Sequence, residues 1–229
     1  MSGGTFDSIA SNAGKEVDPK LAAELQNPYV LSPVQRNPVP PVADSLGLRR
    51  DNTLGVISQH IFTAPQDQAL VHRTWGLLRG TDQDFGPNFQ FNEYIYVGST
   101  VGGIVTWLSG IVLGSILGSS IGISLLKYVM PAPGSGPDLA QAVRSPIRLE
   151  AVAIPDDEKA PRVRSVFAYP SSSYYTTGLF LAEGAASLLY TRELEGGIKG
   201  GCLTPAILGQ DLVKRIQAAG ATFTVEVEK

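Results

Sequence analysis

The chain has few of the residues that bind metals or form disulfides. Cys202 is the single cysteine, which excludes an internal disulfide, and His60 and His72 are the only histidines. A zinc cluster therefore lacks the ligands that its tetrahedral coordination needs. Because Cys202 has no recognisable histidine partner, we interpret it as a small packed thiol rather than a nucleophile. We expect no metal site and no redox-active disulfide.

The chain also lacks a basic surface signal. Its 229 residues carry a formal net charge of −3, and the lysines and arginines are scattered rather than gathered in one stripe. Nucleic acid is therefore not an expected partner. The segment Met1 to Asp18 has no basic region followed by an apolar stretch, so we expect no secretory signal there. A hydrophobic fraction of 43% is enough for a packed core in one or two domains.

The most informative absence is that of charge between Tyr94 and Leu126, where the sequence contains no Asp, Glu, Lys or Arg. The run exceeds the roughly 20 apolar residues that cross a hydrocarbon core about 30 Å thick. Tyr96 near its start, with Lys127 and Tyr128 after its end, suits a membrane interface. The pattern predicts one long apolar, membrane-associated helix, with a buried core helix as the alternative.

Small residues recur at every fourth position of this run. Each glycine costs a helix roughly 1 kcal/mol relative to alanine, so close packing must offset the loss. Small residues four apart let a second helix backbone approach closely in a membrane, which predicts helix-mediated self-association. The candidate membrane or helix-packing residues are Gly102, Gly110, Gly114, Gly118 and Gly122.

The N-terminal part combines short elements with a proline-rich loop. Asp18 is a suitable cap for a helix that begins at Pro19. The prolines between Asn27 and Leu46 favour extended backbone and predict a surface loop. His72 lies at helical spacing with apolar residues and is interpreted as structural. The expected elements are helices at Thr5–Lys15, Pro19–Gln26 and Gln66–Leu78 and strands at Gly55–Thr63 and Asn88–Val97.

The C-terminal part predicts the order strand, strand, helix, helix, strand. The charged turn Asp156–Lys159 fits an antiparallel hairpin. Thr204 is expected to cap the last helix, with Pro205 as its first residue and Gly220 at its end. A loop is expected at Pro131–Pro137, strands at Ile147–Ile154, Arg162–Tyr169 and Thr222–Glu228, and the first helix at Thr176–Tyr190.

These elements define an α+β fold class, with an antiparallel sheet, packed helices and the long apolar helix. We expect three parts: residues 1–93, the apolar helix at residues 94–130, and an α+β region at residues 131–229.

No catalytic residue can be assigned from the sequence. Tyr174 and Tyr175 follow Ser171–Ser173 and could donate protons near a substrate, but hydroxyl-rich turns before helices usually act as caps. Arg162 and Arg164 could hold a carboxylate or phosphate, although a solvated strand face is the commoner outcome.

A dinucleotide site is not expected in this sequence. It requires a strand, a glycine turn and a helix N-terminus in succession, and Ser2–Thr5 cannot supply them. A second glycine cluster resembles a phosphate loop superficially, but it follows a charged turn and precedes the expected cap Thr204. That cluster comprises Gly196, Gly197, Gly200 and Gly201. We therefore predict no cofactor-binding residues.

Several short strings, in this order and spacing, resemble a known family. They are SGGTFDSI at Ser2–Ile9, NPYVLSP at Asn27–Pro33, GPNFQFNEY at Gly86–Tyr94 and GGCLTPA at Gly200–Ala206. With an apolar helix after the aromatic segment, the chain resembles the C-terminal half of saccharopine dehydrogenase-like oxidoreductases and the related trans-acting enoyl reductases.

The resemblance implies a function in lipid metabolism. Complete family members place a nucleotide-binding domain before this half and use NAD(P), and we expect that domain to be absent here. The chain would then be the substrate-facing portion of an NAD(P)-dependent reductase for lipid-like or polyketide-like molecules. It would not be catalytic alone, and would either work with a separate nucleotide-binding domain or be a truncated copy.

The alternative prediction is a non-catalytic protein of a membrane or lipid droplet. Here the apolar run from Tyr94 to Leu126 would anchor the α+β region to the lipid surface. Some relatives in the family have similar locations, which implies membrane association at a lipid droplet or mitochondrion.

Overall fold

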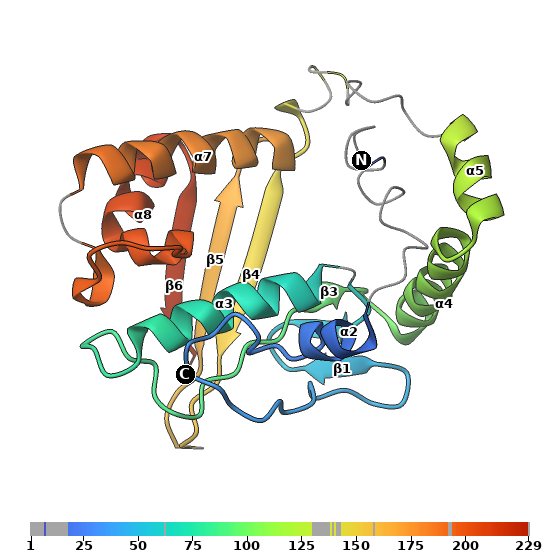
Figure 1. Cartoon of the computed structure of the whole chain (residues 1–229), viewed down its shortest axis with the longest axis horizontal. Helices are drawn as coiled ribbons and strands as arrows, with labels where there is room; N and C mark the ends of the chain where they lie inside the picture. The colour runs from blue at the N-terminus through green and yellow to red at the C-terminus, as the bar shows by residue number, and fades with distance from the viewer. Residues whose placement is uncertain are drawn as a thin grey trace. The chain divides into compact units, whose positions relative to one another are not determined.

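The computed structural model describes Asp7 and residues 18–61, 63–129, 138, 140, 143–157, 159–191 and 194–228. Two compact units make up the chain, and their elements are shown in Figure 1. The first unit contains Met1–Val30, Pro38–Gln68 and Asn92–Asp138, and the second contains Leu31–Asn37, Ala69–Phe91 and Leu139–Lys229. This division differs from the three consecutive parts expected from the sequence. Apart from Asp7, the predicted helix Thr5–Lys15 lies outside the described residues, as does the predicted loop Pro131–Pro137.

Helices and two antiparallel three-stranded sheets confirm the predicted α+β class. In the first unit, β1 (Leu48–Asp51), β2 (Gly55–Ser58) and β3 (Ile95–Tyr96) pair in that order. The Asp51 carboxylate accepts the backbone N–H of Thr53 at 2.9 Å and closes the β1–β2 turn. The predicted strand Gly55–Thr63 is confirmed only in its first four residues.

Two helices confirm predictions made from local signals. Helix α2 spans Pro19–Leu25, and the Asp18 carboxylate accepts the backbone N–H of Lys20 at 2.9 Å, as a capping residue should. Helix α3 spans Ala64–Leu78 and so begins two residues before the predicted helix. The division between the units falls within α3, after Gln68.

The predicted strand at Asn88–Val97 is wrong over most of its length, because only Ile95–Tyr96 forms a strand. The backbone N–H of Phe91 donates to His72 Nε2 at 3.1 Å, and the Phe89 carbonyl accepts from Arg36 at 3.0 Å. Side chains therefore take up backbone hydrogen bonds that a sheet would otherwise use.

The predicted long apolar helix is confirmed, but it covers only part of the uncharged run and is followed by a second helix. Helix α4 spans Thr100–Leu117 and helix α5 spans Ser120–Val129. Ser99 caps α4 by accepting the N–H of Gly102 at 3.1 Å, so the preceding residues stay outside the helix. At the other end, the Ser119 N–H donates to the Ile116 carbonyl at 3.2 Å, a tightened turn that ends the helix. Among the described residues, α4 is the one helix long and apolar enough to cross a membrane.

The second unit is built on a sheet in the order β4-β5-β6. Strands β4 (Ile147–Ala153) and β5 (Val163–Tyr169) form the predicted antiparallel hairpin, and β6 (Thr222–Val227) pairs with β5. Helix α7 spans Ser173–Tyr190 and helix α8 spans Gly209–Ala218. The short 3-10 turns η1 and η2 cover Glu195–Gly197 and Pro205–Leu208. The last helix therefore begins at Gly209, later than the predicted Pro205.

The core of this unit lies between one end of the sheet and the two helices. Phe167 of β5, the middle strand, pairs with Leu149 and Phe223, and its ring lies 5.7 Å from the Phe180 ring of α7. Leu212 and Ile216 of α8 are buried in the same cluster. Since side chains alternate along a strand, Phe167 identifies the helix-covered face of the sheet as that of the odd-numbered residues.

Candidate functional site

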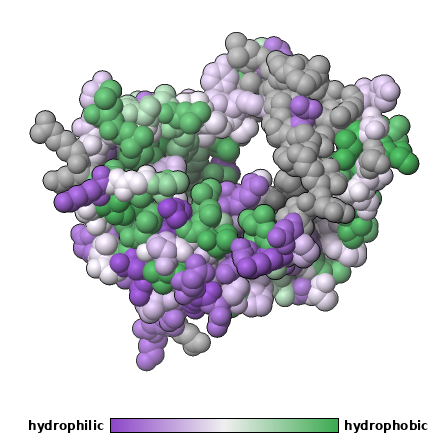
Figure 2. Space-filling view, viewed as in Figure 1, coloured by the Kyte–Doolittle hydropathy of each residue, from purple (hydrophilic) through white to green (hydrophobic). Residues whose placement is uncertain are grey.

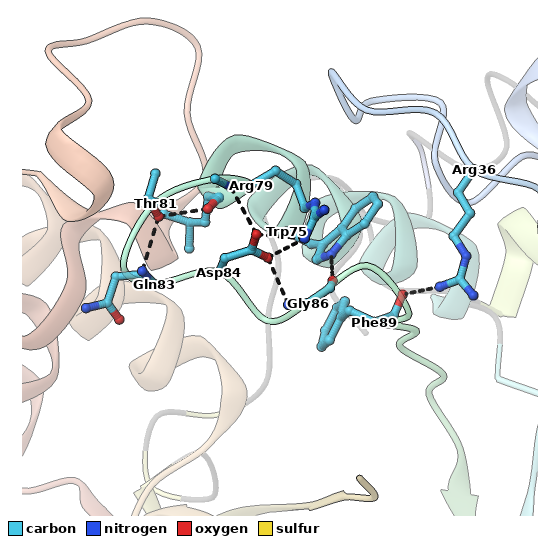
Figure 3. A network of polar contacts seen from close by, with 10 residues as sticks. Arg36, Trp75, Arg79, Thr81, Gln83, Asp84, Gly86 and Phe89 are labelled. Carbon is cyan, nitrogen blue, oxygen red and sulfur yellow. Dashed lines mark hydrogen bonds and ion pairs between the residues drawn. The ribbon is translucent and has the colours of Figure 1, made fainter. Parts of the chain in front are cut away.

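Helix α3 holds the segment that begins at Gly86. Trp75 is buried, and its indole Nε1–H donates to the Gly86 carbonyl at 2.8 Å (Figure 3). One turn earlier, the buried His72 accepts the Phe91 N–H through Nε2. A nitrogen that accepts a hydrogen bond carries no proton, so His72 is held as the neutral tautomer protonated on Nδ1. This confirms the structural interpretation of His72.

Two other segments that carry the family resemblance contact the same helix. Arg73 donates from Nη1 to the Leu31 carbonyl at 2.6 Å and from Nε to the Cys202 carbonyl at 3.1 Å. Buried Thr74 and Thr204 are joined through their hydroxyls at 2.6 Å. Parts of three of the four strings that carry the family resemblance thus converge on α3. Of the fourth string, Ser2–Ile9, the structure describes only Asp7.

The contact with Thr74 corrects the expected role of Thr204. Thr204 occupies the position before η2, but its side chain makes no capping hydrogen bond there. Cys202 also differs from the expectation of a packed thiol, because its side chain is exposed. Its carbonyl, which Arg73 binds, is the part of the residue that holds the segment in place.

The turn after α3 is fixed by an ion pair (Figure 3). Arg79 donates to both carboxylate oxygens of Asp84, at 2.6 and 2.7 Å, and its guanidinium lies 5.6 Å from the centre of the Trp75 ring. The pKa of Asp84 lies below its ordinary value because hydrogen bonds stabilise its carboxylate. The backbone N–H of Gly80 has the largest effect, followed by the N–H of Gly86 and the Arg79 side chain. These contacts position the start of the Gly86–Tyr94 segment.

A carboxyl pair lies where this segment enters the first unit. Glu93 is half-buried next to Asp67 of α3, and burial, followed by the hydrogen bond and negative charge of Asp67, raises the pKa of Glu93 to about 7. Beside it, Gln68 donates to the Asn92 amide oxygen at 3.2 Å. A carboxyl group that titrates near neutral pH can gain or lose a proton under ordinary conditions. Sequence reasoning missed this pair, and its one signal was a glutamate interrupting an apolar alternation.

The sheet of the second unit leaves much of its helix-side face uncovered. The alternation that places Phe167 in the core also places Leu149, Ala151, Val225 and Val227 on this face, and all four are exposed. The other residues on this face of the sheet carry no charge either. We call this surface the open sheet face; it consists of Leu149, Ala151, Ala153, Val163, Ser165, Val225 and Val227.

The opposite face of the same sheet is charged. Glu150 accepts from Arg148 Nε at 2.8 Å and from Arg164 Nη2 at 2.6 Å. Arg162 lies 3.7 Å from the Glu228 carboxylate. The arginines that the sequence suggested for anion binding therefore lie in ion pairs, and the charged side chains of these strands lie on the face opposite the helices.

The remaining sequence candidates do not assemble into a catalytic group. Tyr174 and Tyr175 are exposed on the first turn of α7. Ser172 stands at the cap position of α7, but its hydroxyl makes no capping hydrogen bond. Gly196 and Gly197 belong to η1 and both have positive φ. No three His, Cys, Asp or Glu side chains among the described residues are arranged to hold a metal ion.

The predicted helix-packing glycines fall on two helices and on the residue that ends the first of them. Gly102, Gly110 and Gly114 lie in α4, Gly118 is its C-cap, and Gly122 lies in α5. They therefore do not form one continuous helix face. A Cβ at Gly110 or Gly114 would have no atom within 4 Å, so that part of α4 is open. Their role in membrane contact or self-association stays a prediction.

Comparison with known proteins identifies similar chains. A Mycobacterium tuberculosis protein named "Putative trans-acting enoyl reductase" is 29% identical over 239 residues, which cover 97% of this chain and 56% of that protein. A Mycobacterium bovis protein named "Trans-acting enoyl reductase" is 25% identical over 170 residues, which cover 70% of this chain and 39% of that protein. No protein-family model and no solved structure matches the chain. The chain is thus similar to proteins named as trans-acting enoyl reductases and spans about half of the first one's length, 56%.

Proposed function

We propose that this chain is the substrate-side portion of an oxidoreductase similar to the trans-acting enoyl reductases, and that it binds a lipid-like or polyketide-like acyl chain. The open sheet face is the observation that carries the proposal. It is an uncharged, largely aliphatic surface on a sheet whose other face carries the charged residues and their ion pairs. The similarity to enoyl reductases over 97% of the chain supports the same substrate class. A wider relationship to saccharopine dehydrogenase-like oxidoreductases belongs to this proposal as well.

The open sheet face suits a flexible hydrocarbon. Ala151 and Ser165 are small and lie side by side in the register of β4 and β5, with Val225 next to Ser165 on β6. An aliphatic chain crossing these positions would bury methylene groups, each of which contributes about 0.8 kcal/mol when fully removed from water. Affinity should therefore rise with acyl length until the face is covered.

The glycine cluster that resembles a phosphate loop lacks the surroundings of a dinucleotide site. Gly196 and Gly197 lie in a 3-10 turn rather than between a strand and the N-terminus of an α-helix. We therefore propose that NAD(P) is bound by a separate nucleotide-binding domain and that the present chain contributes substrate binding. No residue is assigned to the chemical step.

Binding of acyl thioesters of increasing length tests this proposal. Val225→Asp places a carboxylate on the open sheet face, while Thr224→Asp, one residue earlier, places it on the opposite face. We expect tighter binding with longer chains, weaker binding by Val225→Asp, and unchanged binding by Thr224→Asp. Equal affinity of the two variants would contradict the assignment. Saturable NADPH binding by this chain alone would contradict the need for a separate nucleotide-binding domain.

A second function, a non-catalytic protein of a membrane or lipid droplet, is favoured by the exposure of α4. Most of its large apolar side chains face solvent, and Figure 2 shows hydrophobic surface over α4 and α5. Flotation of the purified protein with lipid vesicles tests this proposal. Recovery of all the protein in the soluble fraction would contradict it.

A further inference from the structure

Helix α4 carries no charge, and beyond its first turn most of its surface is exposed. Its large apolar residues point to more than half of its circumference at about 100° per residue. The rest is occupied largely by small residues, and Gly110 and Gly114 have no described atom near them. A groove on another protein would cover one face of a helix, whereas lipid surrounds it. The exposed side chains are Val101, Val105, Trp107, Leu108, Ile111, Val112 and Leu113.

The first turn of α4 is attached to the folded part of its unit. Arg50 of β1 donates from Nη2 to the Thr100 hydroxyl at 2.8 Å. Gly103 is buried against Leu48 so closely that a Cβ on Gly103 would overlap the leucine side chain. With Ser99 as the cap, this turn cannot leave the sheet without breaking these contacts. Only the helix beyond Gly103 is free to enter lipid.

The free part of α4 is too short to cross a bilayer. The helix has 18 residues, and subtracting the attached turn leaves a length of about 21 Å at about 1.5 Å per residue. The hydrocarbon core is about 30 Å thick, and an apolar segment of roughly this free length is typical of a buried core helix or of a re-entrant or interfacial segment. The exposure of α4 disfavours a core helix. The helix ends at Leu117, where the chain turns into α5.

Helix α5 has the pattern of a helix that lies along a membrane surface. Ile121, Leu125 and Tyr128 are spaced by four and three residues on one face, and all are strongly exposed. At the attached end of α4, Tyr96 is 71% exposed and Arg50 is exposed as well. An aromatic ring and a cation at this level match the interface and anionic headgroups of a phospholipid membrane.

We propose that α4 enters a single phospholipid leaflet as a re-entrant segment, with α5 lying along the interface, so that the chain before α4 and the chain after α5 remain on the same side. The inference rests on the membrane function proposed above and specifies how the chain meets the lipid. It replaces the bilayer crossing that the length of the uncharged sequence suggests.

Trp107 provides a direct measurement of insertion. Trp107 lies on the free part of α4, whereas the other tryptophan, Trp75, is buried with 2% of its surface exposed. With vesicles of phosphatidylcholine and phosphatidylglycerol, we expect a blue shift of emission and quenching by lipids brominated in their acyl chains. Trp107→Phe is the control and should abolish both signals. Absence of quenching in the unsubstituted protein overturns insertion of α4.

A charge placed on α4 should prevent insertion. Leu108→Asp with Val112→Asp adds two carboxylates to the free part of the helix, each expected to lower partitioning by about a hundredfold at bilayer depth. The matched control is Leu188→Asp with Leu189→Asp on α7, where the side chains are also exposed. We expect the first variant to lose vesicle flotation and the control to retain it. Equal flotation of both variants overturns the assignment to α4.

A double-cysteine experiment distinguishes re-entry from crossing. Cys202→Ser removes the native thiol, and Ser45→Cys and Asp138→Cys place exposed thiols before α4 and after α5, both in the first unit. The protein is reconstituted into sealed vesicles, treated with an impermeant maleimide and weighed by mass spectrometry. In a re-entrant arrangement both thiols lie on the same side of the membrane. Molecules with both thiols outside the vesicle are then labelled twice, and molecules with both thiols inside are not labelled. Singly labelled molecules overturn re-entry but leave membrane association intact, whereas failure to bind vesicles overturns the membrane function itself.

Discussion

Gly103 in α4 and Leu48 in β1 are in such close contact that only a hydrogen fits between them. Replacing Gly103 with Val would push the leucine side chain and the first turn of α4 apart. Overpacking of a buried contact typically costs about 1–3 kcal/mol. We therefore expect Gly103→Val to lower the free energy of unfolding by that amount, measured by urea denaturation followed by circular dichroism.

Gly110 provides the control for that substitution. It lies in the same helix, but a Cβ there would have no atom within 4 Å. Gly110→Ala should raise helix stability by up to about 1 kcal/mol, because alanine loses less backbone entropy than glycine. Destabilisation by both substitutions to the same degree would mean that the contact with Leu48 is not what holds α4.

Local sequence signals predicted a large part of the fold. Asp18 before Pro19 identified the start of α2, and alternation with a charged turn identified the β4–β5 hairpin. Such signals depend on residues a few positions apart, so they survive without knowledge of the tertiary structure. The apolar run was recognised for the same reason, although the Ser99 cap and the turn at Ser119 divide it into a short N-terminal segment and two helices.

The errors arise where distant residues supply the partners. The segment before β3 is not a strand because Arg36 binds the Phe89 carbonyl and His72 binds the Phe91 N–H. Thr204 does not cap a helix with its side chain because its hydroxyl meets Thr74, which is 130 positions earlier. No local pattern encodes these pairs. The carboxyl pair and the open sheet face were missed for the same reason, since both depend on packing.

Asp211 in α8 should make the second unit sensitive to acid. Its carboxylate accepts hydrogen bonds from Thr191 at 2.6 Å, Arg215 at 2.7 Å and buried Ser187 at 2.8 Å, which lower its pKa from 3.8 to about 2. The folded state therefore binds the proton less readily than the unfolded state does. The stabilisation is complete above pH 3.8 and is lost as the pH falls through 2.

Asp211→Asn tests this contribution. We expect the variant to be less stable at neutral pH and to show a smaller further loss of stability between pH 4 and pH 2, measured by thermal unfolding across the pH range. Asp82→Asn, in an exposed loop, is the matched control and should follow the unsubstituted protein. An unchanged acid profile in Asp211→Asn would show that the three hydrogen bonds do not stabilise the carboxylate.

Glu93 should have the opposite dependence on pH. Its pKa is raised from 4.5 to about 7, so between these values the folded state holds a proton that the unfolded state has lost. Stability therefore falls as the pH rises from 4.5 to 7. Glu93→Gln removes the titrating group while keeping a similar shape. We expect the variant to lose this decline and to be more stable than the unsubstituted protein above pH 7, and a decline of equal size in the variant would contradict the assignment.

The contact between Trp75 and Gly86 should stabilise the segment that begins at Gly86. Trp75→Phe keeps an aromatic ring but removes the indole N–H, which leaves the Gly86 carbonyl without that donor. Loss of one such hydrogen bond costs about 1 kcal/mol, and the smaller ring adds a packing defect. Trp107→Phe, on the exposed part of α4, should change stability by less than about 0.5 kcal/mol in the absence of lipid. Urea denaturation of the two variants measures the difference, and equal stabilities would show that α3 does not hold this segment through Trp75.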